Sequence, residues 1–435
     1  MNEGVFHSWG RIGAVAARAA HVTWRHALPA IEGERLAYGL GRSYGDSCLL
    51  GGGTMVETRG LDRLISFDDE SGVVIAEAGM SLDALLRVCV PRGWFLPVSP
   101  GTRLVTLGGA IANDIHGKNH HRAGTFGSHV RGFVLQRSDG HLLDVSPATH
   151  PELFAATIGG LGLTGLILTV ELKLRRITSA FIDAELVRFS GLEDFMALAE
   201  ESEAGFEHTV AWLDCVAGGD RLGRGIFIRG NHAEGTPKDL VAHQPPKLSV
   251  PVDFPDFCLN RYSVEAFNLA YYHRLASDRE KVRQHYSPFF HPLDAVNGWS
   301  RIYGKRGFYQ YQCVVPFAGG MAAMTEILKA ISASGQASFL AVLKTFGDMP
   351  SPGLLSFPRP GITLALDFAN RGASTLELFD RLDAIVREVR GAWYPAKDAR
   401  MSPEDFRLSY PELDRFLPQV DPAFTSDFWK RMNIS

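Results

Sequence analysis

The stretch that decides the fold is RLVTLGGAIANDIHGKNHHRAGTFGSHV, which runs from Arg103 to Val130. It combines the pair Gly108–Gly109 with four of the fifteen histidines in the chain. Histidine clusters and glycine pairs each have several uses, so the pattern is compatible with a metal site, a nucleotide-binding loop or an active-site wall. The choice among these three interpretations depends on what the rest of the sequence offers as partners.

A second glycine-rich segment, GLGRSYGDS (39–47), precedes that stretch. Glycine permits positive φ and close approach of the backbone, so several N–H groups can converge on an anion such as a pyrophosphate. The segment contains neither GxGxxG nor GK[ST], which excludes a Rossmann fingerprint and a P-loop. A third cluster, IGGLGLTGLI (158–167), could close around the same ligand. Together, the clusters favour a large, phosphate-bearing cofactor.

Composition narrows the class of protein. A chain of 435 residues with 46% hydrophobic and 21% charged residues is typical of a globular protein with two or three domains. The net charge of −4 argues against a general nucleic-acid binder. No apolar run is long enough to span a membrane, and the N-terminus lacks the pattern of a signal peptide. Five widely spaced cysteines are typical of reduced thiols, so we expect a cytoplasmic enzyme.

The glycine content and the predicted secondary structure of the sequence change near residue 178. Before it, short apolar runs alternate with glycine-rich turns, and the spacing of apolar residues predicts a helix over 82–89. A hairpin is expected around Asp139–Gly140, and a strand over 166–174. After it, helices are predicted at 190–202, 319–335 and 374–391, and strands at 307–316, 337–347 and 361–369. This order predicts an antiparallel sheet covered by helices on one face, while 230–256 is typical of a mobile surface loop.

The glycine clusters resemble the FAD-binding domain of the vanillyl-alcohol-oxidase (PCMH-type) flavoprotein superfamily, in which a segment like RLVTLGG (103–109) lines the flavin. The resemblance implies an α+β, two-domain flavoprotein. Its FAD-binding domain would comprise residues 1–178 completed by 392–435, and its substrate-binding domain 179–391. Many members attach FAD covalently through a histidine of the first loop. Arg42 occupies that place here, which implies non-covalent FAD.

Longer stretches are similar to the family of oxidases that act on decaprenylphosphoryl-β-D-ribose. They are 39–47, 100–131, 291–316, 338–347, 355–368 and 392–400. This similarity implies oxidation of the 2'-hydroxyl of a polyprenyl-phosphoryl-β-D-ribose to a 2'-keto sugar, the first half of epimerisation to an arabinose donor. It also implies a partner reductase and peripheral contact with a membrane. Three departures stand out: Ala365 replaces a cysteine, Thr363 replaces an asparagine, and the short segment 21–36 predicts that one helix is missing.

The resemblance also assigns roles to individual residues. The residues expected to contact FAD are Gly39, Leu40, Gly41, Arg42, Ser43, Tyr44, Gly45, Asp46, Gly101, Thr106, Leu107, Gly108, Gly109, Asn113, Asp114, Ile115, His116, Ile167 and Tyr394. The residues expected to contact substrate are Lys118, Tyr303, Gln312, Lys344, Thr363 and Lys397.

Oxidation of an alcohol requires a hydride acceptor, which the cofactor supplies, and a group that receives or stabilises the hydroxyl proton or its charge. The catalytic candidates are Lys397, Tyr44 and His116. Lys397 is favoured in either of two roles: a base whose pKa is lowered by desolvation, or a cation that stabilises developing negative charge. Lys118, Lys344 and Arg301 could hold the phosphate of the substrate.

Three alternatives are weighed against this function. DIHGKNHH (114–121) could suggest a metal-dependent hydrolase, but Gly117 and Lys118 interrupt the ligands and Lys118 would repel a cation. We therefore expect no metal, and expect His120, His121 and His129 to be structural or exposed. A related oxidase of a free sugar, alditol or aldonolactone would use the same motifs, and a non-catalytic FAD-binding protein would not need Lys397. Oxygen and a quinone are both open as electron acceptors.

Overall fold

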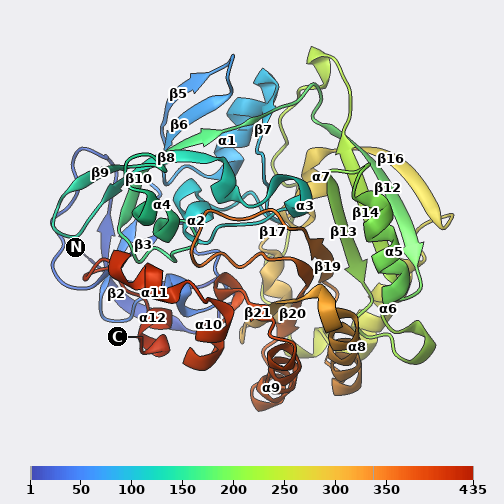
Figure 1. Ribbon diagram of the computed structural model, residues 1–435. Helices are drawn as coiled ribbons and strands as arrows, with labels where there is room; N and C mark the ends of the chain where they lie inside the picture. Colours follow the sequence, from blue (N-terminus) through green and yellow to red (C-terminus); the bar gives the residue numbers. More distant parts are fainter. Residues whose placement is uncertain (1, 337, 435) are drawn as a thin grey trace.

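The computed structural model describes residues 2–336 and 338–434, and begins with a small four-stranded sheet (Figure 1). Its strands, in the order β1-β2-β4-β3, are β1 (Asn2–His7), β2 (Ala14–His21), β4 (Thr54–Glu57) and β3 (Arg35–Tyr38). The described residues between β2 and β3 contain no helix, as the short segment 21–36 predicts. The first glycine loop, 39–47, follows directly after the end of β3 at Tyr38.

A second, five-stranded antiparallel sheet carries the other glycine clusters. Its order is β5-β6-β10-β8-β9, with β5 (Leu64–Asp68), β6 (Val73–Glu77), β10 (Leu166–Lys173), β8 (Val130–Gln136) and β9 (Leu142–Val145). The hairpin predicted at Asp139–Gly140 is confirmed, because β8 pairs with β9 around it. The helices of this region are α1 (Leu82–Cys89), α2 (Leu107–Ala112), α3 (His120–Ala123) and α4 (Pro151–Thr157), and β7 (Trp94–Phe95) pairs with β11 (Arg175–Arg176).

The predicted helix over 82–89 is confirmed as α1. Its apolar positions Leu82, Leu85, Leu86 and Cys89 are buried on one face, as the spacing requires. The side chain of Ser81 accepts a hydrogen bond from the Ala84 amide and so caps the helix start. This part of the fold is therefore encoded locally.

The third sheet has eight strands and begins at Phe181, just after the change in composition near residue 178. Its order is β16-β12-β14-β13-β19-β20-β18-β21. The strands are β16 (Arg279–His285), β12 (Phe181–Phe189), β14 (Gly225–His232), β13 (His208–Leu213), β19 (Ala341–Phe346), β20 (Gly361–Ala369), β18 (Phe308–Val315) and β21 (Ala392–Trp393). All the pairings recorded between them are antiparallel, as predicted.

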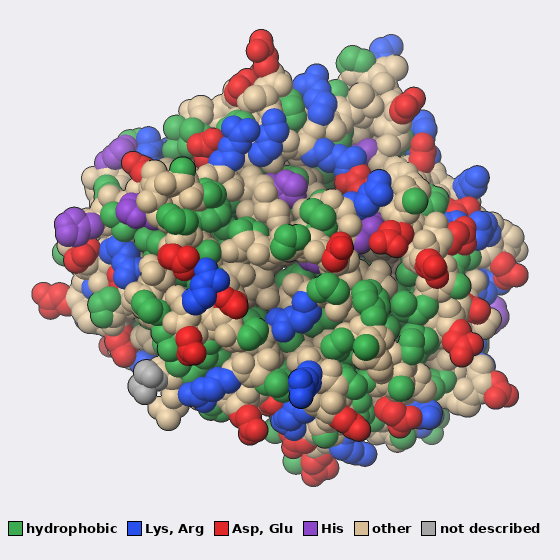
Figure 2. Space-filling model, in the orientation of Figure 1, with side chains coloured by type: hydrophobic (Ala, Val, Ile, Leu, Met, Phe, Trp, Pro, Cys, Tyr) green, Lys and Arg blue, Asp and Glu red, His purple; other side chains and the backbone are tan. Residues whose placement is uncertain are grey.

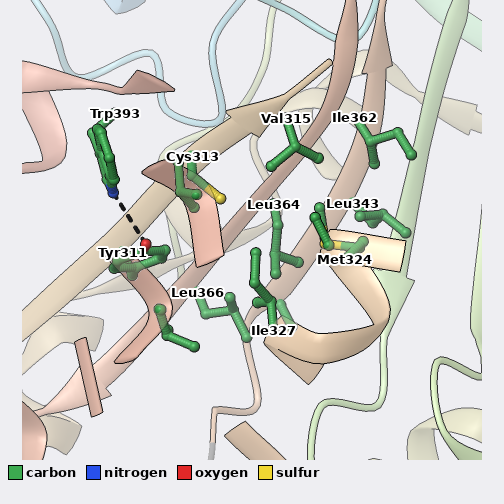
Figure 3. Close-up of a cluster of buried hydrophobic side chains, with 14 of the residues drawn as sticks. Tyr311, Cys313, Val315, Met324, Ile327, Leu343, Ile362, Leu364, Leu366 and Trp393 are labelled. Atoms are coloured by element: carbon green, nitrogen blue, oxygen red, sulfur yellow. Dashed lines mark hydrogen bonds between the residues drawn. The ribbon is translucent and has the colours of Figure 1, made fainter. Parts of the chain in front are cut away.

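Helices cover one face of this sheet, also as predicted: α5 (Leu192–Ser202), α8 (Phe317–Ser334) and α9 (Ala373–Glu388) (Figure 1). Figure 3 shows Leu343 and Leu364 of the strands against Met324 and Ile327 of α8. These four side chains are at most 1% exposed. The largest core of the molecule therefore lies between this sheet and its helices.

The last part of the chain joins the third sheet to the first. β21 pairs with β18, whereas Arg431 of α12 (Asp427–Met432) forms an ion pair with Asp46. The amide of Gly51 donates to the carboxylate of Asp427. Both chain ends lie on the same side of the molecule in Figure 1. The two short helices α10 (Pro403–Ser409) and α11 (Leu413–Phe416) connect these contacts, while the division of the chain at residue 178 stays a prediction.

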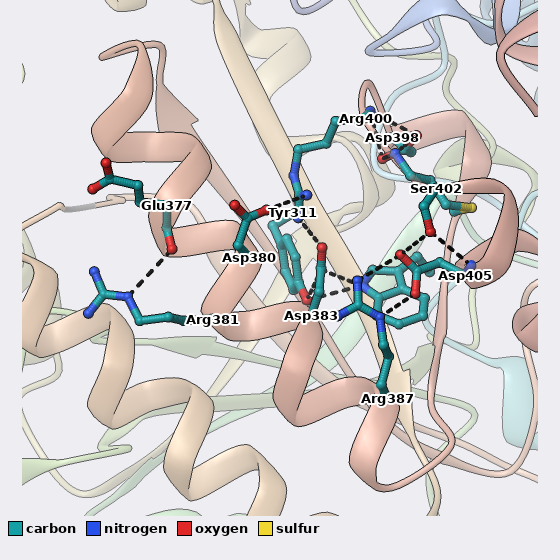
Figure 4. A network of polar contacts seen from close by, with 12 residues as sticks. Tyr311, Glu377, Asp380, Arg381, Asp383, Arg387, Asp398, Arg400, Ser402 and Asp405 are labelled. Atoms are coloured by element: carbon teal, nitrogen blue, oxygen red, sulfur yellow. Dashed lines mark hydrogen bonds and ion pairs between the residues drawn. The ribbon is translucent and has the colours of Figure 1, made fainter.

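A polar network fixes the segment that follows β21. Asp383 of α9 accepts hydrogen bonds from the Tyr311 hydroxyl at 2.9 Å and the Trp393 indole at 2.8 Å (Figure 4). Arg400 also contacts Asp383, and the same helix holds α10 through Arg387 and Asp405. Because these groups are largely buried, their hydrogen bonds are needed to offset desolvation. The network thereby fixes the backbone on both sides of residue 397.

The prediction of a surface loop over 230–256 is only partly correct. β14 continues to His232, and the His243 side chain is 2% exposed, with contacts to Asp83 and Tyr286. The later part of the segment is exposed and pairs through β15 (Leu248–Ser249) with β17 (Val296–Asn297). The partners of His243 are far away in sequence, so polarity alone suggested exposure. Helices α6 (Arg261–Tyr272) and α7 (Tyr286–Phe290) complete this region.

No helix within the described residues is long and apolar enough to cross a membrane. All five cysteines are free thiols. On the face shown in Figure 2, positive and negative side chains are interspersed, with no field of one sign.

Replacing Leu364 by alanine should lower the free energy of unfolding by about 2–5 kcal/mol, because it removes buried methyl groups and leaves a cavity. The measurement is urea-induced unfolding followed by circular dichroism. Leu142, which is 57% exposed, is the matched control, and its alanine variant should change stability by less than about 0.5 kcal/mol. Equal losses in the two variants would contradict this core assignment.

Candidate active site

A cavity of about 1110 Å³ lies where the glycine clusters meet the open face of the third sheet. Pockets for one drug-sized ligand are usually about 300–1,000 Å³, so this cavity has room for a large cofactor and part of a second ligand. One side is formed by residues of the loops 39–44, 99–109 and 113–118. The opposite side is formed by side chains of β18, β19 and β20.

Strand alternation explains why the sheet offers polar groups to the cavity. Successive side chains of a strand point to opposite faces, so Leu364 and Leu366 pack against helices while Thr363 and Ala365 line the cavity. The same alternation places Gln312 of β18 on the cavity side. On β19, Leu343 is in the core and Lys344 lines the cavity.

The first glycine loop lies against the start of α2. A Cβ atom on Gly39 would lie 2.6 Å from Thr106 Oγ1, and Gly41 has φ +59° with its Cβ position 2.4 Å from the Tyr38 hydroxyl. Thr106 caps α2 by accepting from the Gly109 amide at 3.1 Å. The wall here is therefore backbone that only glycine can form. A backbone surface of this kind, at a helix start, is suited to a pyrophosphate.

The side chain of Arg42 is engaged in contacts within the protein. Its guanidinium lies 4.1 Å from the centre of the Trp9 ring and donates to the Leu40 carbonyl at 2.7 Å. Burial lowers the pKa of Arg42, although nearby Asp294 opposes that effect. The glycine-lined wall, the size of the cavity and its cations fit FAD, and the loop 39–45 contains no imidazole that could attach it.

Three lysines from different elements face the cavity: Lys118 after α2, Lys344 on β19 and Lys397 after β21. Burial lowers the pKa of Lys118 to about 8. Burial and the positive charges of the other two lysines lower the pKa of Lys344 to about 7. Burial lowers the pKa of Lys397 to about 8, against the opposing effect of Asp367. Several cations around one cavity favour an anionic occupant.

Lys397 is brought beside Tyr44 by backbone pairing. The Tyr44 amide donates to the Ala396 carbonyl at 2.8 Å, which ties the first glycine loop to the segment after β21. The Lys397 ammonium lies 4.1 Å from the centre of the Tyr44 ring. Burial keeps the pKa of the Tyr44 hydroxyl well above 10, so Tyr44 is a hydrogen-bond donor at neutral pH.

His116 is a neutral imidazole between two polar neighbours. Lys344 Nζ lies 3.0 Å from its Nδ1, and the side-chain amide of Gln312 lies 3.0 Å from its Nε2. Burial, with the charge of Lys344, moves the pKa of His116 well below its usual value. A neutral imidazole has one acceptor nitrogen and both ring nitrogens face nitrogen donors, so His116 accepts from either Lys344 or the Gln312 amide. Both ring nitrogens of His116 therefore lie within hydrogen-bond distance of protein groups.

The structure brings most of the predicted site residues to the cavity. Those that line it are Gly39, Leu40, Gly41, Arg42, Ser43, Tyr44, Gly101, Thr106, Gly108, Gly109, Asn113, Ile115, His116, Lys118, Ile167, Gln312, Lys344, Thr363, Tyr394 and Lys397. Thr363 donates to the Cys313 carbonyl at 2.8 Å, so its hydroxyl is already engaged.

Five predicted residues lie behind the wall instead: Gly45, Asp46, Leu107, Asp114 and Tyr303. A Cβ on Gly45 would lie 1.9 Å from the Asp398 carbonyl oxygen, so Gly45 is needed for loop packing. Leu107 is fully buried in the core, and Tyr303 stacks on Phe308 at 4.3 Å. Asp114 accepts from the Gly127 amide at 2.8 Å and contacts two serines. These residues shape the wall without facing the cavity.

The other histidines of the opening stretch have separate structural contacts. His120 is buried against Phe346 at 4.8 Å between ring centres. His121 contacts the Phe206 carbonyl at 3.1 Å, and His129 contacts the Ala123 carbonyl at 2.8 Å. Across the part of the chain that the structure describes, no group of three or more potential ligands could hold a metal ion.

Sequence reasoning missed two polar groups of the sheet. Gln310, which could have faced solvent, lines the cavity and donates to the Tyr44 hydroxyl at 3.2 Å. Asp367 lies opposite Gln310 in the register of β18 and β20 and contacts it. The period-2 pattern of 361–369 places Asp367 on the same face as Thr363, which is the signal that could have found it.

Replacing Gly41 by alanine should weaken FAD binding by about tenfold, because a left-handed residue with a Cβ costs roughly 1–2 kcal/mol that binding must offset. The measurement is the dissociation constant for FAD, from the flavin fluorescence of the reconstituted protein. Gly52 is the matched control, since it also has positive φ, at +73°, but lies outside the cavity with open space around it. Unchanged FAD affinity in the Gly41 variant would remove this loop from the cofactor site.

Comparisons with known proteins identify the domain and the family of this chain. The family model described as an FAD binding domain matches residues 33–146, which include the first two glycine clusters. Decaprenylphosphoryl-beta-D-ribose oxidase of Mycolicibacterium smegmatis is 38% identical over 413 residues, covering 92% of this chain and 89% of the relative.

Two further relatives show how far the similarity extends. An uncharacterized protein of Streptomyces coelicolor is 33% identical over 82% of this chain and its own full length. L-gulonolactone oxidase of Mus musculus is 31% identical over only 28% of this chain and 27% of its own length. The long match to the mycobacterial oxidase spans both the FAD-binding region and the third sheet. The chain therefore belongs to the decaprenylphosphoryl-β-D-ribose oxidase family and carries the FAD-binding domain of that family.

Proposed function

We propose that this protein is an FAD-dependent oxidase that converts the 2'-hydroxyl of a polyprenyl-phosphoryl-β-D-ribose into a ketone. The observation that carries this proposal is one cavity in which the FAD-binding loops face Lys118, Lys344 and Lys397. The lysines supply positive charge for a substrate phosphate, which a neutral sugar would not require. Family membership supplies the substrate class, because the relative that matches 92% of this chain is named for decaprenylphosphoryl-ribose.

Bound FAD supplies the hydride acceptor. The protein has to orient the sugar, exclude water and manage the hydroxyl proton. Tyr44 stays protonated and can donate to a sugar oxygen, while Gln312, anchored beside His116, can bind a hydroxyl. Lys397 is the group we place at the 2'-hydroxyl, where its amine can accept the proton or its ammonium can stabilise the alkoxide.

The candidates for binding the substrate phosphate are positively charged side chains that line the cavity. Lys118 and Lys344 are the phosphate-binding candidates, since both ammonium groups line the cavity. Arg301 is a weaker candidate, because its guanidinium donates to the carbonyls of Val250 at 3.1 Å and Pro251 at 2.7 Å. Tyr303 and Thr363 are also weaker, since the first lies behind the wall and the second is engaged by the Cys313 carbonyl.

An apolar surface next to the cavity favours a lipid-linked substrate over a free sugar, alditol or lactone. Val252 lines the cavity and is 64% exposed, and Phe257 and Tyr262 farther along the chain are 76% and 82% exposed. Exposed apolar side chains that lie together on a surface often mark a membrane or protein contact. We place the membrane that holds the polyprenyl chain against this surface, as a peripheral contact. A reductase that consumes the keto sugar would complete the epimerisation.

Anaerobic mixing with polyprenyl-phosphoryl ribose should bleach the flavin absorption of the oxidised protein, because hydride transfer from the sugar reduces FAD. Free ribose, alditols and aldonolactones at the same concentration should not. Replacing Lys397 by alanine should slow bleaching by about a hundredfold or more while FAD stays bound. Bleaching by an aldonolactone but not by the lipid-linked sugar would replace this proposal with the free-sugar alternative.

We also propose that FAD is bound without a covalent bond, because Arg42 occupies the loop position of the attached histidine in other members. Precipitation of the protein with trichloroacetic acid should leave the yellow flavin in the supernatant. Flavin that stays with the protein pellet through gel electrophoresis in detergent would contradict this assignment.

A further inference from the structure

Asp367 is a buried carboxylate for which the catalytic scheme above has no use. It lies on β20, two and four residues after Ala365 and Thr363, and so on the face of the sheet that bounds the cavity. Its side chain is fully buried, whereas these two neighbours line the cavity. Asp367 therefore lies directly behind the cavity wall.

The contacts of Asp367 lead to Tyr44. The Gln310 amide nitrogen donates both to the Asp367 carboxylate and to the Tyr44 hydroxyl oxygen. Because that oxygen already accepts from Gln310, the Tyr44 O–H is free to point away from it. Among the described residues, the second carboxylate oxygen of Asp367 has no partner at full hydrogen-bond geometry, although the buried Tyr303 hydroxyl lies near it. A carboxylate this buried and incompletely paired needs a nearby cation or a proton.

Lys397 is the cation placed to meet that need. Its ammonium lies over the ring of Tyr44, whose hydroxyl is bound to Gln310. In the described part of the chain, no carboxylate lies within ion-pair distance of Lys397. Asp367 and Lys397 are therefore linked indirectly, because Gln310 contacts Asp367 and the Tyr44 hydroxyl, and Lys397 lies over the Tyr44 ring. Their interaction is screened less than one between two surface charges, since Asp367 is fully buried and Lys397 faces the cavity.

The other titratable groups around this pair come from four elements. Lys344 of β19 and His116 and Lys118 of the loop after α2 face the same cavity as Lys397. Tyr303 lies behind the wall with Asp367, and Tyr44 lies between. The lysines disfavour a charge on one another, while both tyrosines stay neutral. Asp367 is thus the nearby group that favours the charged form of Lys397.

We propose that Asp367 is a positioning residue of this site: its carboxylate fixes Gln310 against the Tyr44 hydroxyl and supplies the negative charge that holds Lys397 as an ammonium facing the cavity. Burial raises the pKa of Asp367 to about 7 and Lys397 opposes the rise, so the carboxylate is fully charged, and the pairing strongest, above pH 7. The inference rests on the proposed function for its role in catalysis, but the charge pairing itself can be tested without substrate.

The test is an NMR titration of the FAD-bound protein labelled with ¹³C at the lysine ε-carbons. The Lys397 signal is assigned by its absence in Lys397→Met. In Asp367→Asn, the pKa of Lys397 should fall by about one unit or more, because an opposite charge is lost from a buried site. Asp214→Asn is the matched control: it neutralises another buried aspartate of the same domain that does not line the cavity, and should leave that pKa unchanged. An unchanged Lys397 pKa in Asp367→Asn would overturn the proposal.

A reciprocal measurement covers the case in which Asp367→Asn does not fold. Coupling between two sites is mutual, so Lys397→Met should raise the pKa of Asp367 above its value of about 7. This is measured with ¹³C-labelled aspartate, and an Asp367 carboxyl that titrates as in the wild-type protein would equally overturn the proposal.

The pH dependence of flavin bleaching provides a separate test of the pairing. In Asp367→Asn, the limb of the pH–bleaching profile that reports Lys397 should move to lower pH by the same amount as the NMR pKa. If the NMR shift occurs but the wild-type protein is not bleached by polyprenyl-phosphoryl ribose, the pairing stands and the proposed substrate is wrong. If bleaching occurs without an NMR shift, the substrate stands and the role of Asp367 is wrong.

Discussion

The site depends on the strand pairing of β18, β19 and β20, in which every strand has one face against helices and one against the cavity. The register places Gln312 opposite Ala365, and Lys344 opposite Thr363. A slip of one residue would turn leucines of the core toward the cofactor and bury the lysine among helices. Such a slip is excluded by the apolar face, since Leu343, Leu364 and Leu366 are fully buried. Hydrophobic packing on one side thereby fixes the chemistry on the other.

The second constraint is electrostatic. Lys118, Lys344 and Lys397 are brought together by elements that are far apart in sequence, and each disfavours charge on its neighbours. A cluster of this kind is costly without anions, because burial removes solvation from each ammonium. Asp367 offsets the cost at one lysine only. An anionic ligand in the cavity would offset the cost at the other two lysines.

Local sequence was sufficient for much of the fold. The helix α1, the β8–β9 hairpin and the sheet with helices on one face follow from apolar spacing and turn residues that lie close together in the chain. The loops at the cavity could also be recognised from their glycines, because positive φ and close contacts at these positions allow few residues other than glycine. Most of the residues carried over by resemblance line the cavity, and this success comes from long matching stretches that a single short motif would not give.

What the sequence could not provide is the identity of partners across the sheet. Gln310 alternates with apolar residues as any half-exposed strand residue would, and only its pairing with β20 shows that it joins Asp367 to Tyr44. His243 is buried for the same reason, since Asp83 and Tyr286 meet it from distant segments.

The histidines of 103–130 lie in four separate environments, and His120, His121 and His129 have the structural contacts that the sequence analysis expected. His116 alone reaches the cavity, and its two nitrogens are occupied by Lys344 and the Gln312 amide. A ring held on both sides cannot rotate to take up a proton or a metal without breaking these contacts. Its effect is to hold Gln312 and Lys344 at fixed positions beside the substrate space. The stretch 103–130 therefore supports one wall of the cavity, against the strands that carry Gln312 and Lys344.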